Sequence, residues 1–146
     1  MISKWMKLAA LAALPAIALP VAVTAGEKEA KTCLNTKIWD GYNDGWAVRT
    51  AVDATLKQGE HRVYLVTLYA GNQYSIKACG DKSMANVDLV LHDKDGKEVA
   101  RDKSEDSEPS LSYTPPATGT FYVALYAANL VAEARDAGVA MAVTYK

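Results

Sequence analysis

The 146-residue chain lacks the short motifs that mark most catalytic and nucleic-acid-binding sites. It has only two histidines, His61 and His92, which we interpret as surface residues, and its serines lack the sequence of a hydrolase nucleophile elbow. No Gly-rich phosphate loop, His-Glu-x-x-His motif or paired-Cys zinc pattern is present. Lysine and arginine are everywhere interleaved with acids, which disfavours nucleic acid as a partner. We therefore predict that the protein is not an enzyme and does not bind nucleic acid.

The chain also lacks an uninterrupted apolar run that would span a membrane well. Two prolines break the apolar stretch from Leu8 to Val23, and two lysines with no acid precede it. Val23-Thr24-Ala25 fits the small-residue cleavage rule, so residues 1–25 are predicted to be a secretory signal peptide cleaved after Ala25. Removing it leaves 14 basic against 17 acidic residues, a net charge of −3. We expect a periplasmic or secreted protein without a membrane anchor, with residues 26–146 forming one domain.

Cysteine is scarce: Cys33 and Cys79 are the only two. An even count in an exported protein predicts one disulfide. It would close a loop of 47 residues, counting both ends, which the chain-entropy estimate values at about 4 kcal/mol. Two buried free thiols are the alternative.

Short segments of alternating or β-branched residues, separated by Gly, Pro and Asn turns, dominate the rest of the chain. About eight strands at this spacing predict an all-β fold, an antiparallel β-sandwich. The expected strands cover residues 46–56, 61–69, 74–79, 86–92, a return strand from Val99, 111–113, 120–126 and 139–145.

The clearest single element is a hairpin from Asn86 to Lys103. Val87, Leu89 and Leu91 alternate with Asp88, Val90 and His92, as in a half-buried strand. Asp93-Lys94-Asp95-Gly96 follows, with Asp suited to open a type I turn and Gly to supply a positive φ. This sequence predicts a tight turn and a return strand.

Two segments are not predicted to be simple strands. Residues 26–37 are predicted to form a short helical or irregular segment, held by Cys33, and residues 38–46 a loop because of two Asp-Gly steps. Residues 129–137 are Ala-rich and suit either a helix capped by Asn129 or the extension of two strands into a long hairpin. We favour the hairpin, because the neighbours are all strands.

Three motifs stand in order along the middle of the chain: LYAGNQYSIKACGD at 68–81, NVDLVLHDKDGKEVARD at 86–102 and PSLSYTPPATGTFYVAL at 109–125. Together they resemble the bacterial pre-peptidase C-terminal domain over roughly 60 residues. The resemblance implies a jelly-roll-like β-sandwich of the kind that serves as an accessory module on secreted peptidases. Some relatives, the collagen-binding domains of bacterial collagenases, bind calcium and extracellular matrix.

No cofactor is expected, with calcium as the one candidate. Asp93 and Asp95 resemble the start of an oxygen-ligand loop, although a hairpin turn explains them equally well. Asp40, Asn43 and Asp44 form a second oxygen-rich set, near the place where the collagen-binding relatives hold their calcium. The acidic run 102–108 is interpreted as a solvated loop.

Trp39, Tyr42 and Trp46 form the candidate binding surface, since aromatic residues on a loop can stack on sugars or anchor a partner protein. The alternative, which we favour, is that both tryptophans cover the end of the core. Two functions therefore remain: a stand-alone module that binds a protein or polysaccharide, or a structural, stress-type periplasmic protein without a small ligand. Exposure of the aromatic residues would favour the first and burial of both tryptophans the second. The oligomeric state stays open.

Overall fold

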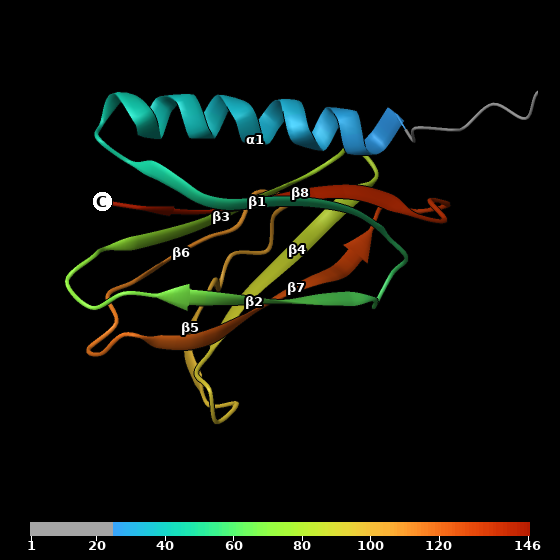
Figure 1. Cartoon of the computed structure of the whole chain (residues 1–146). Coiled ribbons are helices and arrows are strands. Elements are labelled where there is room, and N and C mark those ends of the chain that lie inside the picture. The colour runs from blue at the N-terminus through green and yellow to red at the C-terminus, as the bar shows by residue number, and fades with distance from the viewer. Residues whose placement is uncertain (1–24) are drawn as a thin grey trace, which may run out of the picture.

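The computed structural model describes residues 25–146, in which one helix precedes eight strands (Figure 1). The elements in chain order are α1 Ala25–Asn43, β1 Ala47–Leu56, β2 His61–Leu68, β3 Tyr74–Gly80, β4 Met84–His92, β5 Glu98–Arg101, β6 Ser110–Tyr113, β7 Gly119–Leu130 and β8 Ala137–Tyr145. The predicted signal peptide lies outside the described residues except for Ala25. Within the described part, no helix has the length and apolar character needed to cross a membrane.

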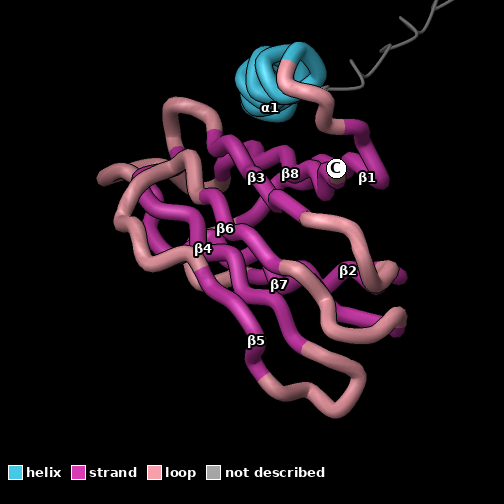
Figure 2. The backbone as a smooth tube through the Cα atoms, turned by 90° about the vertical axis from the view of Figure 1, so that its left-hand side faces the viewer, coloured by secondary structure: helices cyan, strands magenta, loops and turns pink. Residues whose placement is uncertain are grey.

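The strands form two four-stranded antiparallel sheets, in the orders β1-β8-β3-β6 and β2-β7-β4-β5. Side chains that alternate along each strand fill the space between the sheets, because successive residues of a strand point to opposite faces. Helix α1 lies over the outer face of the first sheet (Figures 1 and 2). The predicted antiparallel β-sandwich is confirmed.

The hairpin of β4 and β5 has the predicted turn. Val87, Leu89 and Leu91 are fully buried in the core. The Gly96 N–H donates to the Asp93 carbonyl at 3.0 Å, and Gly96 has a φ of +79°. Because this φ lies in the left-handed region, glycine is the residue that adopts it without strain.

The predicted loop at 38–46 is wrong for its first half, because α1 continues to Asn43. The first Asp-Gly step lies inside the helix, where Gly41 is buried with the Trp46 Cβ only 3.5 Å from where its own Cβ would be. The helix ends at the second step. Gly45 has a φ of +87°, and the N–H groups of Gly45 and Trp46 donate to the carbonyls of Tyr42 and Gly41. These bonds form a Schellman motif, which satisfies the last carbonyls of the helix.

The segment 129–137 contains no helix: β7 runs to Leu130 and β8 begins at Ala137. The predicted strand extension is right, but the predicted hairpin is wrong. The two strands belong to different sheets, so residues 131–136 cross from one layer of the sandwich to the other.

Candidate functional site

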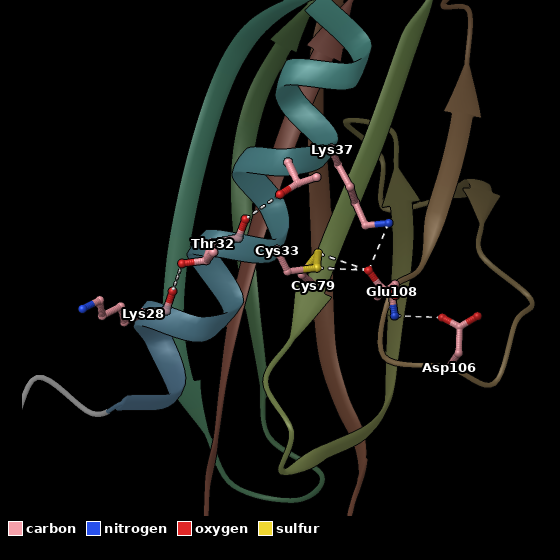
Figure 3. Close-up of a disulfide and its surroundings, with 8 residues drawn as sticks. Lys28, Thr32, Cys33, Lys37, Cys79, Asp106 and Glu108 are labelled. Atoms are coloured by element: carbon pink, nitrogen blue, oxygen red, sulfur yellow. Dashed lines mark hydrogen bonds and ion pairs between the residues drawn. A yellow bond between two sulfur atoms is a disulfide. The ribbon is translucent and has the colours of Figure 1, made fainter.

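Helix α1 is fixed to the sandwich at one face. Ala30 and Leu34 pack against Ala140 and Ala142 of β8, whose small side chains let the helix approach closely. Cys33 of this face is bonded to Cys79 of β3, with Cα atoms 6.0 Å apart (Figure 3). The predicted disulfide is confirmed, and it joins the helix directly to the sheet beneath it.

A carboxylate lies beside the disulfide. Glu108 Oε1 is 3.0 Å from Cys33 Sγ and 3.1 Å from Lys37 Nζ, so it forms an ion pair with the helix (Figure 3). Within the described residues, Cys33, Cys79 and Glu108 are the one group of three Cys, His, Asp or Glu side chains close enough to share a metal. Because both sulfurs are engaged in the disulfide, this group does not offer thiolate ligands.

Glu108 belongs to the acidic run that the sequence suggested to be a solvated loop. Glu105, Asp106 and Glu108 are exposed, as a solvated loop requires, and two acids of the run also accept backbone hydrogen bonds. The Asp102 carboxylate accepts from the backbone N–H groups of Ser104 and Ser110, and the Asp106 carboxylate accepts from the N–H of Glu108. The acids therefore fold the connector between β5 and β6 and aim Glu108 at the helix. The contact of Glu108 with Lys37 had no signal in the sequence, because the two residues are far apart in the chain.

The aromatic candidates separate into two environments. Trp39 and Tyr42, on the last turns of α1, are each 65% exposed. Their rings meet edge to face, with centroids 5.8 Å apart and planes at 78°. Trp46 is half-buried beside Gly41. The interpretation that both tryptophans cover the core is thus wrong for Trp39, because the helix carries it away from the core.

Trp39, Tyr42 and the half-buried Ile38 together line a shallow hollow of about 290 Å³ on the helix surface. We call these three residues the helix patch. Exposed aromatic side chains of this size bring a large apolar area into a contact while losing few rotamers. The arrangement is suited to recognition rather than to bond-breaking chemistry.

The two candidate calcium sets lie apart. Asp93 Oδ1 accepts from the N–H groups of Asp95 at 2.9 Å and Lys97 at 3.0 Å, so this oxygen shapes its own turn. The second set, Asp40, Asn43 and Asp44, is exposed around the C-terminal end of α1. A pocket of about 270 Å³ lies between the hairpin turn and residues 116–121. These hydrogen bonds explain the Asp93 carboxylate as part of the turn.

The remaining titratable side chains of interest lie around β2. His61 is exposed and stacks on Tyr126 with ring centroids 5.2 Å apart. Burial raises the pKa of the Tyr64 phenol above its ordinary value of 10.0; the nearby Arg62 lowers this pKa and Asp53 raises it. Neither feature resembles a nucleophile with its base.

Comparison with known proteins confirms the resemblance drawn from the three motifs. Residues 61–127 match the family model of the bacterial pre-peptidase C-terminal domain. The search of curated proteins found no match to the chain.

Two solved structures share the fold. The pre-peptidase C-terminal domain of collagenase from Bacillus anthracis is 15% identical, with 66% of this chain and 89% of that chain covered at a TM-score of 0.52. PliG from Aeromonas hydrophila, a periplasmic inhibitor of g-type lysozyme, is 14% identical, with 68% and 88% covered at a TM-score of 0.52. At these identities the likeness establishes the fold alone.

Proposed function

We propose that this chain, a bacterial pre-peptidase C-terminal domain-like protein, is an exported, non-catalytic module that binds a protein or polysaccharide partner in the periplasm or outside the cell. The Cys33–Cys79 disulfide supports export, because such bonds persist in oxidising compartments. The sequence of residues 1–25 supports it as well.

The observation that carries the proposal is the exposure of Trp39 and Tyr42 on a helix that is held in place. Large exposed aromatics are over-represented among the residues that dominate binding energy. The disulfide and the packing of Leu34 fix α1 before any partner arrives. A partner would therefore meet a preorganised pair of rings, which lowers the ordering cost of binding.

The ring geometry favours a protein over a polysaccharide. Two rings inclined at 78° cannot both lie flat against one sugar chain, whereas each can enter a separate apolar pocket of a protein. The periplasmic lysozyme inhibitor among the structural neighbours is a precedent for a sandwich of this shape acting through protein contact. Burial of both tryptophans would favour the alternative, a structural protein without a ligand, and the exposure of Trp39 therefore disfavours it.

Capture from periplasmic extract tests the proposal. Immobilised mature protein is compared with a Trp39→Ala, Tyr42→Ala variant and with Val131→Ala, a control that removes an exposed apolar side chain elsewhere. We expect a protein that the wild type and the control retain and the double variant loses. Capture unaffected by the double variant would contradict the helix patch, and co-sedimentation with insoluble polysaccharide lost in the same variant would favour a sugar ligand.

A further inference from the structure

The outer face of the sheet β2-β7-β4-β5 is uncovered, and the β2 edge of this face carries an exposed apolar strip, Val63 and Leu65. In the described part of the chain α1 is the one helix, and it lies over the other sheet (Figure 1). The register places Val63, Ala124 and Val90 in one row across this face and Leu65 beside Tyr122 in the next. Leu65 is 65% exposed and Val63 is 53% exposed. The rest of this face is polar, with His92 and Arg101 in the same rows and Asp88 in the adjacent row, as a solvated sheet face normally is. The apolar strip is therefore confined to the β2 edge.

Both exposed aliphatic residues belong to β2, which is the last strand at one edge of its sheet. An edge strand presents unpaired backbone N–H and C=O groups, and proteins protect such edges with charges, prolines, bulges or short strands. Between His61 and Tyr69 the chain has no proline and no charged residue except Arg62. Its pairing with β7 runs unbroken over eight residues. This edge is therefore long, regular and unprotected.

The other three edges of the two sheets carry the protection that β2 lacks. β5 and β6 have four residues each, and β5 ends in the Glu98–Arg101 ion pair. β1 is interrupted by a bulge between Val48 and Thr50, and its Asp53 pairs with a lysine of α1. The same chain thus protects three edges and leaves the most apolar one open.

We propose that β2 pairs with β2 of a second copy of this chain, antiparallel and about a twofold axis, to form one continuous eight-stranded sheet. This inference goes beyond the proposed function and rests on different residues. The Ala127 N–H donates to the Glu60 carbonyl, so the alternation of an antiparallel ladder directs the backbone groups of Arg62, Tyr64 and every second residue toward β7. The backbone groups of His61, Val63, Leu65 and Thr67 then face the open edge.

The strand is complementary to itself when Leu65 lies on the twofold axis. Leu65 then faces its own copy, Val63 faces Thr67, and Arg62 faces Leu68, so no like charges meet. This register uses every residue from 61 to 69 and joins the two Val63–Leu65 strips into one continuous apolar band on the outer face of the sheet. An isologous contact of this kind closes after two copies and leaves no open strand for further growth.

The mass of the protein in solution tests the dimer, measured by light scattering from micromolar to millimolar concentration. We expect twice the chain mass for the wild type and one chain mass for Leu65→Lys, because the substitution places two ammonium groups opposite each other on the axis. The matched control is Val48→Lys, which puts the same charge on the exposed side of the β1 edge, where Val48 is 44% exposed. It should stay dimeric. Circular dichroism verifies that both variants are folded.

A single cysteine tests the register. Residues paired across an antiparallel ladder have Cα atoms about 5.5 Å apart, within the range that a disulfide spans. Leu65→Cys should therefore form a covalent dimer on mild oxidation, and Val48→Cys should not. A wild type that is monomeric at every concentration overturns the proposal, as does a dimer that Leu65→Lys leaves intact or Val48→Lys dissociates.

Discussion

Removing the Cys33–Cys79 bond should cost this small domain a large share of its stability. The perturbation is the double variant Cys33→Ala, Cys79→Ala, chosen because Cys79 is fully buried and alanine brings no polar group into that space. The bond joins residues 46 apart in sequence. Closing a loop of that size restricts the unfolded chain, and the entropy model gives about 4 kcal/mol for it.

The other contacts between α1 and the sheet are too weak to replace the bond. The Lys37–Glu108 and Lys31–Asp53 ion pairs are partly exposed, and such pairs contribute about 0–1 kcal/mol each. The apolar helix face consists of Ala30 and Leu34, with Ile38 half-buried beside them. Loss of the disulfide therefore leaves α1 held by a narrow apolar strip.

Urea denaturation followed by fluorescence and circular dichroism measures the effect. We expect the free energy of unfolding to fall by about 4 kcal/mol and, for a domain of roughly 120 residues, Tm to fall by about 15 °C. The m-value should rise, because an unfolded chain without the bond exposes more surface. Wild type with a reductant is the matched comparison. A loss below about 1 kcal/mol with an unchanged m-value would refute the assignment of stability to the unfolded state.

Three further outcomes are expected from changes elsewhere. Gly96→Ala should lower the free energy of unfolding by about 1 kcal/mol, because a Cβ there meets no atom and only the positive φ is strained. Gly138→Ala should lower it by about 3 kcal/mol or more, because its Cβ would lie 2.3 Å from the Gly26 backbone. Thermal denaturation compares the two variants. Below pH 10 the Tyr64 phenol is protonated in both the folded and the unfolded protein, and above pH 10 the unfolded chain loses this proton first. The free energy of unfolding should therefore fall as pH rises past about 10, and it should fall less in Tyr64→Phe. Urea titration measures both. Calcium in place of a chelator should leave Tm unchanged, because Asp93 already accepts two backbone hydrogen bonds; a rise of about 3 °C would instead indicate a cation at one of the two acidic loops.

The strands could be predicted from sequence because their signal is local. Alternation along a strand and the turn residues beside it depend on neighbours in the chain, as at Asp93 and Gly96. The disulfide was predicted from the even cysteine count together with the export signal. Which strand pairs with which is not local. β7 and β8 were expected to form a hairpin, yet each pairs only with strands far from it in sequence.

The helix was underestimated because its stability comes from tertiary packing. The Asp40-Gly41 sequence predicts a turn. In the structure Gly41 lies in the helix, and Trp46 packs against the space where a Cβ would be. A signal for the docked helix was present in β8, where Val139, Met141 and Val143 alternate with Ala140 and Ala142 rather than with polar residues. A strand that is apolar on both faces must be covered on both, and small residues on one face leave room for a helix.

The exposure of Trp39 follows directly from that correction. On a loop the residue could have folded back over the core, but on a docked helix its position is fixed relative to Leu34, which faces the sheet. The helix patch therefore lies on the layer opposite the open β2 edge (Figure 1). Pairing through β2 would leave both helix patches of a dimer free and relate them by a twofold axis. A partner with two binding sites could then engage both patches, and the effective concentration of the second would raise the overall affinity without any new contact. In these two proposals the β2 edge serves assembly and the helix patch serves recognition, and substitution at Leu65 separates the two experimentally.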